Sequence, residues 1–159
     1  MKKHFTTFNK NQAGNQSRHK TNIMFTHNCF IRKNSECLRK SLDLIGKRNL
    51  CNIHDGILIT HSDRHYSLLD CNEIIEIMLD DGFIYCGTNE ELFLAIAALR
   101  DDSDRFQWFI HDDSDWHNDQ NIFWHKCESE SIKIDMAFNI MYSDCRKATV
   151  WELIEHFNK

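Results

Sequence analysis

The chain has 159 residues, of which 42% are apolar and 27% charged, with five glycines and no proline. This composition excludes collagen-like and Pro/Gly-rich chains and fits one globular domain. The longest apolar run, Leu92 to Leu99, has eight residues, whereas a membrane helix needs roughly 20. No apolar segment follows the basic start Met1-Lys2-Lys3-His4, so we expect no export signal and a cytoplasmic location.

The net charge of −5 conceals a strong asymmetry along the chain. Residues 1–69 hold twelve Lys/Arg against four Asp/Glu, residues 70–119 hold two against fourteen, and residues 120–159 hold five against six. A basic arm therefore precedes a strongly acidic middle. The acidic middle is either a solvated surface that keeps the protein soluble or a docking surface for a basic partner. Because it repels phosphate, it disfavours nucleic-acid binding.

The cysteine count predicts free thiols rather than a disulfide framework. Seven is an odd number, and no two cysteines have the C-x-x-C spacing. We therefore expect buried thiols in a reducing compartment.

Residues 1–26 are polar and basic and show no helical or strand period. We expect a disordered basic arm there. A translation start at Met24 is the alternative, in which case most of this arm is not part of the protein. If the protein contacts nucleic acid at all, this arm is the segment expected to do so.

Residues 27–159 are predicted to form a single α+β domain. Residues 30–32 suggest a short strand, and Asn34 is a plausible N-cap for a helix that buries Leu38, Leu42 and Ile45 and ends at Gly46.

Turn residues predict a three-stranded meander after this helix. Asp55-Gly56 indicates a tight hairpin between residues 50–54 and 57–61, and a second turn leads into residues 65–69.

After residue 69 the order of strand, helix and strands begins a second time. The apolar segment Ile74–Leu79 is ambiguous and leans towards strand, and residues 83–86 suggest another strand. Thr88 and Glu91 have the spacing of a capping box. The run Leu92–Leu99 that follows is apolar on every face, so we expect a helix buried between other elements.

The last third of the chain predicts further strands and a final helix. Residues 105–111 and 121–127 suggest two strands, and the alternation of Ile132 with Ile134 and of apolar residues over 138–142 suggests others. A capping box from Thr149 to Glu152 opens a C-terminal helix over 149–157.

These elements predict an α+β fold with a mainly antiparallel sheet and two to three packed helices. The order of strand, capped helix and strands occurs twice, which suggests an internal β-α-β-β duplication with halves 29–69 and 74–142 plus the C-terminal helix. Two capped helices in one α+β protein can also align by chance.

The candidate binding residues are Asp112, Asp113, Asp115 and Trp116. They begin a polar loop over 112–120 that cannot easily bury a tryptophan. An exposed Trp surrounded by Asp is a reasonable anchor for a protein interface. The alternative is that Trp116 folds back onto the sheet.

Metal binding is a weaker alternative, carried by His27, Cys29, His125 and Cys127. His125 and Cys127 share one face of a predicted strand, and His27 and Cys29 repeat the His-x-Cys spacing. The two pairs could together offer four zinc ligands if their strands were adjacent. His-x-Cys is not an established ligand spacing, so our main prediction is no metal.

No catalytic residue can be assigned. The turn His61-Ser62-Asp63-Arg64-His65 holds the residue types of a hydrolase triad, but neighbours in one turn cannot adopt triad geometry. No phosphate-binding, dinucleotide-binding or hydrolase motif is present, so we predict no cofactor and do not favour an enzyme.

Three segments carry a resemblance: Cys86–Asp102, Gln107–Phe109 and Lys147–Phe157. With these segments, residues 28–159 resemble small uncharacterised accessory proteins of bacteriophages and mobile elements of gut anaerobes. The resemblance implies a phage-encoded accessory protein in the host cell cytoplasm, and it brings no known activity or ligand. Trp151 departs from the smaller or acidic residue expected in the final helix.

The preferred functional hypothesis is a non-enzymatic accessory protein that binds a host or defence-system protein through its acidic surface. The alternative is a module that sequesters a small molecule or nucleotide between the two halves. A third hypothesis is a nucleic-acid-associated protein that uses the basic arm.

Overall fold

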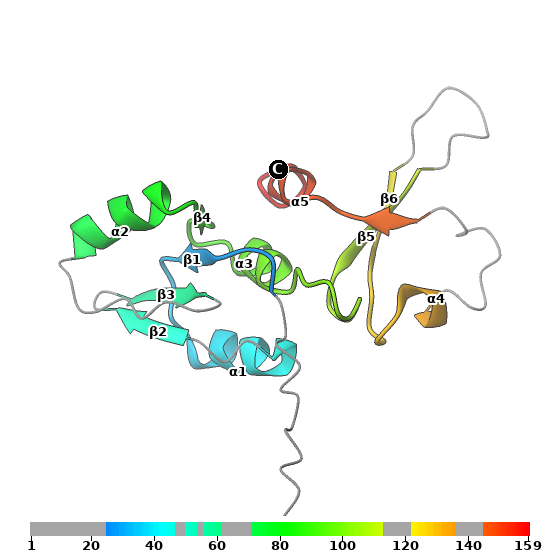
Figure 1. The fold of residues 1–159 in the computed structure, drawn as a ribbon, viewed down its shortest axis with the longest axis horizontal. Coiled ribbons are helices and arrows are strands. Elements are labelled where there is room, and N and C mark those ends of the chain that lie inside the picture. The colour runs from blue at the N-terminus through cyan, green and yellow to red at the C-terminus, as the bar shows by residue number, and fades with distance from the viewer. Residues whose placement is uncertain (1–24, 47–49, 54–55, 62–70, 113–121, 136–144) are drawn as a thin grey trace, which may run out of the picture.

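The computed structural model describes residues 25–46, 50–53, 56–61, 71–112, 122–135 and 145–159 (Figure 1). Nearly all of the predicted basic arm lies outside these residues. The helices of the described part are α1 (Glu36–Ile45), α2 (Cys71–Asp80), α3 (Glu90–Ala97), α4 (Ile132–Asp135) and α5 (Val150–Phe157). Its strands are β1 (Cys29–Ile31), β2 (Leu50–Ile53), β3 (Ile57–Thr60), β4 (Ile84–Tyr85), β5 (Trp108–Asp112), β6 (Ile122–Lys126) and β7 (Arg146–Lys147).

The predicted α+β class is confirmed, but the strands form two sheets. One sheet has the order β2-β3-β1-β4, and the other has the order β6-β5-β7. All pairs are antiparallel except β1 with β4. The described part also has five helices rather than two or three.

The first helix follows its prediction apart from the cap. The N-cap is Ser35, not Asn34, because the Ser35 hydroxyl accepts the hydrogen bond from the Leu38 N–H at 3.1 Å. Gly46 ends the helix with a φ of 90°, a left-handed conformation that glycine adopts without steric cost.

The hairpin predicted at Asp55-Gly56 is confirmed. Strands β2 and β3 pair antiparallel, and Ile53 lies opposite Ile57 at the turn. The third strand of the meander, predicted over 65–69, lies outside the described residues.

The strand prediction for Ile74–Leu79 is wrong, because this segment belongs to helix α2. Met78 is fully buried and Ile75 half-buried, and both pack on Phe30 and its neighbours in the first sheet. The three β-branched isoleucines of this segment favour a strand locally, but a helix brings Ile75 and Met78 onto one face that packs on the sheet.

Helix α3 is buried as expected. Its N-cap is Asn89 rather than Thr88, since the Asn89 side chain accepts the hydrogen bond from the Leu92 N–H at 3.1 Å. All of Leu92–Leu99 is buried except Leu94, which is half-buried.

In the last third, the strands at 105–111 and 121–127 are confirmed as the shorter β5 and β6. The strand predicted from Ile132 and Ile134 is wrong, because these residues form α4. Ile132 is buried, whereas Ile134 is 61% exposed, so the alternation did not mark one buried face. Residues 138–142 lie outside the described part.

Helix α5 begins with the predicted capping box. The Glu152 N–H donates to the Thr149 hydroxyl at 3.3 Å, and the Thr149 N–H donates to the Glu152 carboxylate at 2.8 Å. Leu153 is fully buried, whereas Trp151 is 76% exposed.

Helix α3 lies between the two sheets in Figure 1. Alternate residues of β1 face opposite sides: Ile31 contacts the cluster that holds α1 and α3, and Phe30 contacts the cluster of α2. The cluster around α3 also includes Ile110 of the second sheet and Leu153 of α5. One hydrophobic core therefore joins both sheets.

The element order β-α-β-β occurs twice, as β1-α1-β2-β3 and as β4-α3-β5-β6. The strand pairing differs, because β1 joins its own hairpin, whereas β4 joins β1 in the other sheet. The internal duplication stays a prediction.

Among the described residues, the helices are all too short or too polar to cross a bilayer.

Candidate functional site

The predicted acidic binding residues are placed only in part. Asp112 ends β5 and lies opposite Ile122 in the second sheet. Asp113, Asp115 and Trp116 lie outside the described residues. The acidic docking surface therefore stays a prediction.

The predicted metal ligands are not brought onto adjacent strands. Cys29 belongs to β1, which pairs with β3 and β4, whereas His125 belongs to β6 in the other sheet. Within the described residues, no group of three His, Cys, Asp or Glu side chains could hold a metal ion. The arrangement that zinc would need from His27, Cys29, His125 and Cys127 is thus missing.

Among the described cysteines, Cys29, Cys86 and Cys127 are buried free thiols. The Cys29 sulfur lies 3.2 Å from the Thr60 hydroxyl oxygen, and its neighbour Cys86 has a raised pKa because of the contact with Cys29 and because of burial. Burial and the nearby Asp135 carboxylate raise the pKa of Cys127 to about 11. Cys86 and Cys127 are therefore protonated at neutral pH and make poor nucleophiles.

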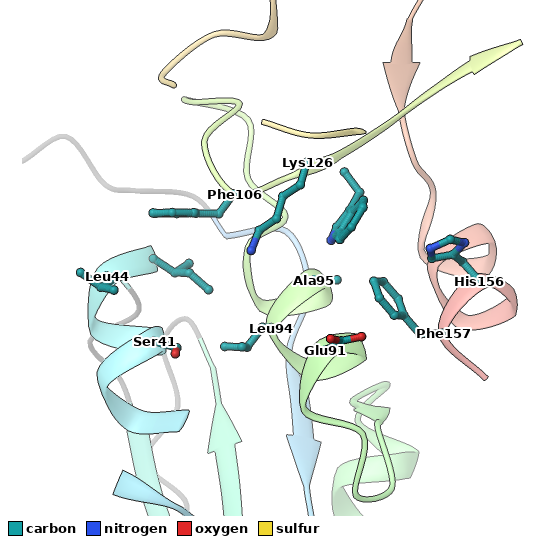
Figure 2. Close-up of a pocket in the computed structure, with 11 residues that line it drawn as sticks. Ser41, Leu44, Glu91, Leu94, Ala95, Phe106, Lys126, His156 and Phe157 are labelled. Atoms are coloured by element: carbon teal, nitrogen blue, oxygen red, sulfur yellow. The ribbon is translucent and has the colours of Figure 1, made fainter. Parts of the chain in front are cut away.

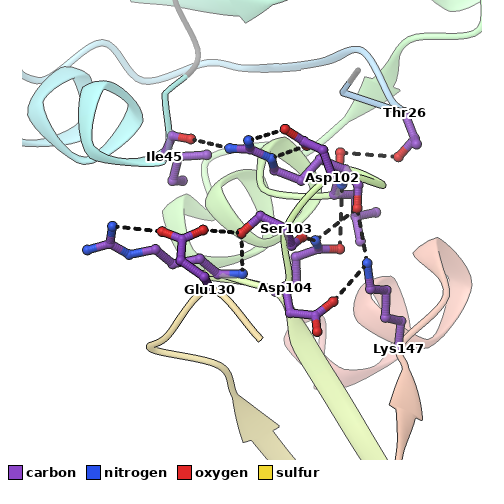
Figure 3. A network of polar contacts seen from close by, with 11 residues as sticks. Thr26, Ile45, Asp102, Ser103, Asp104, Glu130 and Lys147 are labelled. Atoms are coloured by element: carbon purple, nitrogen blue, oxygen red, sulfur yellow. Dashed lines mark hydrogen bonds and ion pairs between the residues drawn. The ribbon is translucent and has the colours of Figure 1, made fainter. Parts of the chain in front are cut away.

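Part of the acidic middle is neutralised within the fold. The Arg100 guanidinium binds both carboxylate oxygens of Asp102 at 2.6 Å and donates to the Ile45 carbonyl at 3.3 Å (Figure 3). Arg100 thus ties the segment after α3 to the end of α1. This contact also holds the pKa of Asp102 below its usual value.

The same segment is tied to the second sheet. Asp104 accepts from the Lys147 ammonium at 3.2 Å and from the Ile132 N–H at 3.0 Å. The Ser103 hydroxyl donates to the Glu130 carboxylate at 2.7 Å (Figure 3). Ser103 and Asp104 therefore connect the segment after α3 to β7, to α4 and to the chain just before α4.

The described part contains a cleft of about 360 Å³ among α1, α3, α5 and the second sheet (Figure 2). Eleven residues line it: Ser41, Leu44, Ile45, Glu91, Leu94, Ala95, Phe106, Trp108, Lys126, His156 and Phe157. They come from both proposed halves and from the C-terminal helix.

The walls of the cleft are mainly apolar and aromatic. The rings of Trp108 and Phe157 meet edge to face with centroids 5.4 Å apart. The imidazole of His156 stacks on Trp124 at 4.0 Å with an interplanar angle of 22°. These contacts fix the rings of the α5 wall against the second sheet.

Phe106 lines the cleft in a conformation that is unusual for its type. Its φ is 66°, in the left-handed region that costs a non-glycine residue roughly 1–2 kcal/mol. The Phe106 N–H donates to the Cys127 carbonyl at 2.7 Å, and the Arg105 guanidinium lies 4.9 Å from the ring centroid. Such strain concentrates where a side chain must be held for function.

Four polar side chains interrupt the apolar walls. Ser41 comes from α1, Glu91 from the first turn of α3, Lys126 from the end of β6, and His156 from α5. Burial and the nearby Lys159 lower the pKa of His156, although Glu91 acts in the opposite direction. His156 is therefore predominantly neutral at pH 7.

The sequence did not single out these lining residues. A ligand between the two halves was an expectation, but no motif pointed to particular side chains. The one available signal was the apolar run Leu92–Leu99, from which a partly uncovered Leu94 could not be predicted.

Comparison with known proteins adds no relative: no family model matches the chain, and no curated protein or solved structure is significantly similar to it.

Proposed function

We propose that this chain is a non-catalytic binding protein that takes up a small aromatic molecule in the cleft between α1, α3, α5 and the second sheet. The single observation that carries this proposal is the aromatic cleft itself, with Phe106, Trp108 and Phe157 in its walls. This is the small-molecule hypothesis of the sequence analysis, with the ligand between the two halves.

The size and composition of the cleft fit a small organic ligand. Its volume of about 360 Å³ lies in the range of roughly 300–1,000 Å³ that is usual for ligand sites. Predominantly apolar walls with a few polar groups are also typical of such sites. Flat aromatic walls favour a flat ring system over a flexible chain, because offset and edge-to-face ring contacts add to the burial of apolar surface.

The polar groups favour binding over catalysis. The Ser41 hydroxyl donates to the Cys37 carbonyl of its own helix at 3.2 Å, and His156 is stacked on Trp124. Ser41 and His156 therefore do not form the nucleophile and base pair that acyl transfer would need.

The accessory role implied by the resemblance is compatible with this proposal, since a sequestering protein needs no catalytic residue. Binding of a host protein through Asp112, Asp113, Asp115 and Trp116 is a separate proposal that rests on the sequence alone.

Indole is a suitable neutral probe for the cleft. We expect titration calorimetry to show saturable binding of indole to the full chain, and a rise in melting temperature with indole concentration. Leu94→Trp should abolish this binding, because the larger ring fills the cleft from α3.

Leu79→Trp is the matched control, since Leu79 is 49% exposed on α2 and does not line the cleft. This variant should bind indole as the unmodified chain does. Absence of binding to the unmodified chain would overturn the proposal, and so would equal binding by the Leu94→Trp variant.

A further inference from the structure

We propose that the cleft selects an aromatic zwitterion, a flat ring compound that carries one carboxylate and one ammonium group, such as a free aromatic amino acid. This inference rests on the proposed function and names its ligand class. It is carried by two opposite charges on different walls of the cleft.

Lys126 supplies the positive charge. It is exposed at the end of β6, and its ammonium nitrogen lies 5.9 Å from the centroid of the Phe106 ring. In Figure 2 its side chain extends into the cleft from the side of the second sheet. Over the described residues, Lys126 has no acidic side chain within ion-pair distance. A ligand carboxylate is the chemical complement of such a group.

Glu91 supplies the negative charge from the opposite wall. It is exposed in the first turn of α3, and Figure 2 shows it beside Phe157, on the far side of the cleft from Lys126. Its neighbour Glu90 is bound by Lys33 at 2.8 Å, whereas Glu91 has no cationic side chain within ion-pair distance in the part of the chain described. A ligand ammonium group complements this carboxylate.

The overall charge of the cleft separates this ligand from the nucleotides considered in the sequence analysis. Among the side chains that line the cleft, His156 has a lowered pKa and is predominantly neutral, so the charges of Lys126 and Glu91 balance each other. A nucleotide carries several negative charges, of which Lys126 could meet one while Glu91 repels the rest. A zwitterion matches both groups at once, and the apolar walls take its ring.

Four probes that share one ring test the inference: tryptophan, tryptamine, indole-3-acetate and indole. We expect calorimetry to show tryptophan binding at least about tenfold more tightly than indole, with the two singly charged probes in between. Lys126→Met should reduce tryptophan to the affinity of tryptamine. Glu91→Gln should reduce tryptophan to the affinity of indole-3-acetate.

Lys133→Met and Glu155→Gln are the matched controls, since both residues are exposed and neither lines the cleft. Both controls should retain the order of affinities. If indole binds as tightly as tryptophan, or if Lys126→Met leaves the preference for tryptophan unchanged, the zwitterion inference is overturned while the proposed function stands. If none of the four probes binds, the proposed function itself fails.

Discussion

Two carboxylates, those of Glu152 and Asp135, accept several hydrogen bonds near the ends of helices and strands. Glu152 accepts hydrogen bonds from the Thr149 N–H and hydroxyl, both at 2.8 Å, and pairs with the Arg146 guanidinium. Asp135 accepts from the Ser129 N–H at 3.1 Å and from the Glu128 N–H. These contacts favour the charged carboxylates and lower the pKa of both residues to about 2. Glu152 thus helps to join β7 to α5, and Asp135 fixes the chain between β6 and α4.

These lowered values predict a loss of stability in acid. The pKa of Glu152 is about 2 in the folded chain against an ordinary 4.5, so its carboxylate stabilises the fold fully above pH 4.5. This contribution decreases as the pH falls from 4.5 towards 2. Urea unfolding of the unmodified chain and of Glu152→Gln, followed over this pH range, should give a difference in unfolding free energy that shrinks with acid.

Glu155→Gln is the control, because Glu155 is exposed on the same helix. Its difference from the unmodified chain should be small throughout. A Glu152→Gln difference that is constant with pH would contradict the assigned role of this carboxylate.

At the scale of elements, α3 is the helix on which α1 and α5 both pack. It contacts β1 of the first sheet as well as α1 and α5, which in Figure 1 lie below and above it. The Asn89 side chain at its start also donates to the Phe157 carbonyl at 2.8 Å, which joins α3 to the end of α5. Leu92, Phe93 and Ile96 are at most 2% exposed, because a helix with neighbours on all sides must be apolar on all sides.

A charge inside α3 should therefore unfold the protein. Ile96→Asp or Leu92→Asp buries a carboxylate without a partner, which costs several kcal/mol, comparable with the total stability of about 5–15 kcal/mol of a typical domain. We expect circular dichroism to show no cooperative thermal transition for either variant. Leu44→Asp on α1 is the control, because Leu44 is 73% exposed. Soluble Ile96→Asp protein that still melts cooperatively would refute this account of α3.

At the scale of the whole molecule, the two sheets share one core. Leu58 of the first sheet, Ile96 of α3 and Ile110 of the second sheet belong to the same buried cluster. The polar contacts of Arg100 and Lys147 lie beside this core and connect the same elements. The cleft depends on this arrangement, since Ser41 lines it from α1 and Lys126 from β6 of the second sheet.

A shared core predicts a single unfolding transition. Three of the four tryptophans, Trp108, Trp124 and Trp151, belong to β5, β6 and α5, so their fluorescence reports on the second sheet and on α5. Far-ultraviolet circular dichroism reports on the entire chain. We expect both signals to change at the same urea concentration, as two-state unfolding requires.

Leu58→Ala tests this coupling directly, because Leu58 is fully buried in the first sheet and far from the tryptophans in sequence. A cavity there should cost about 2–5 kcal/mol and should lower the fluorescence midpoint as much as the dichroism midpoint. A fluorescence transition that does not respond to Leu58→Ala would show that the sheets unfold separately.

Local patterns in the sequence predicted local structure well. The capping box from Thr149 to Glu152, the glycine stop at Gly46 and the hairpin before Ile57 were all found where the residues indicated. These features depend on hydrogen bonds and backbone conformations within a few residues, so the sequence alone contains their cause. The burial of α3 was also predictable from the sequence, because a helix formed by Leu92–Leu99 has no polar face to turn towards water.

The tertiary structure alone decided the rest. Ile74–Leu79 is helical because a helix lets Ile75 and Met78 pack together on the first sheet, and Ile132 begins a helix rather than a strand in a segment held by Asp104. The second sheet likewise pairs Phe109 with Lys147, and the cleft has Ser41 and Phe157 in its walls, residues that are far apart in the chain. The free energy gained by burying apolar surface depends on the area buried, and not on the direction of the contact or on how far apart the residues are in the chain. A local pattern can therefore show that a side chain must be covered, but not which element covers it.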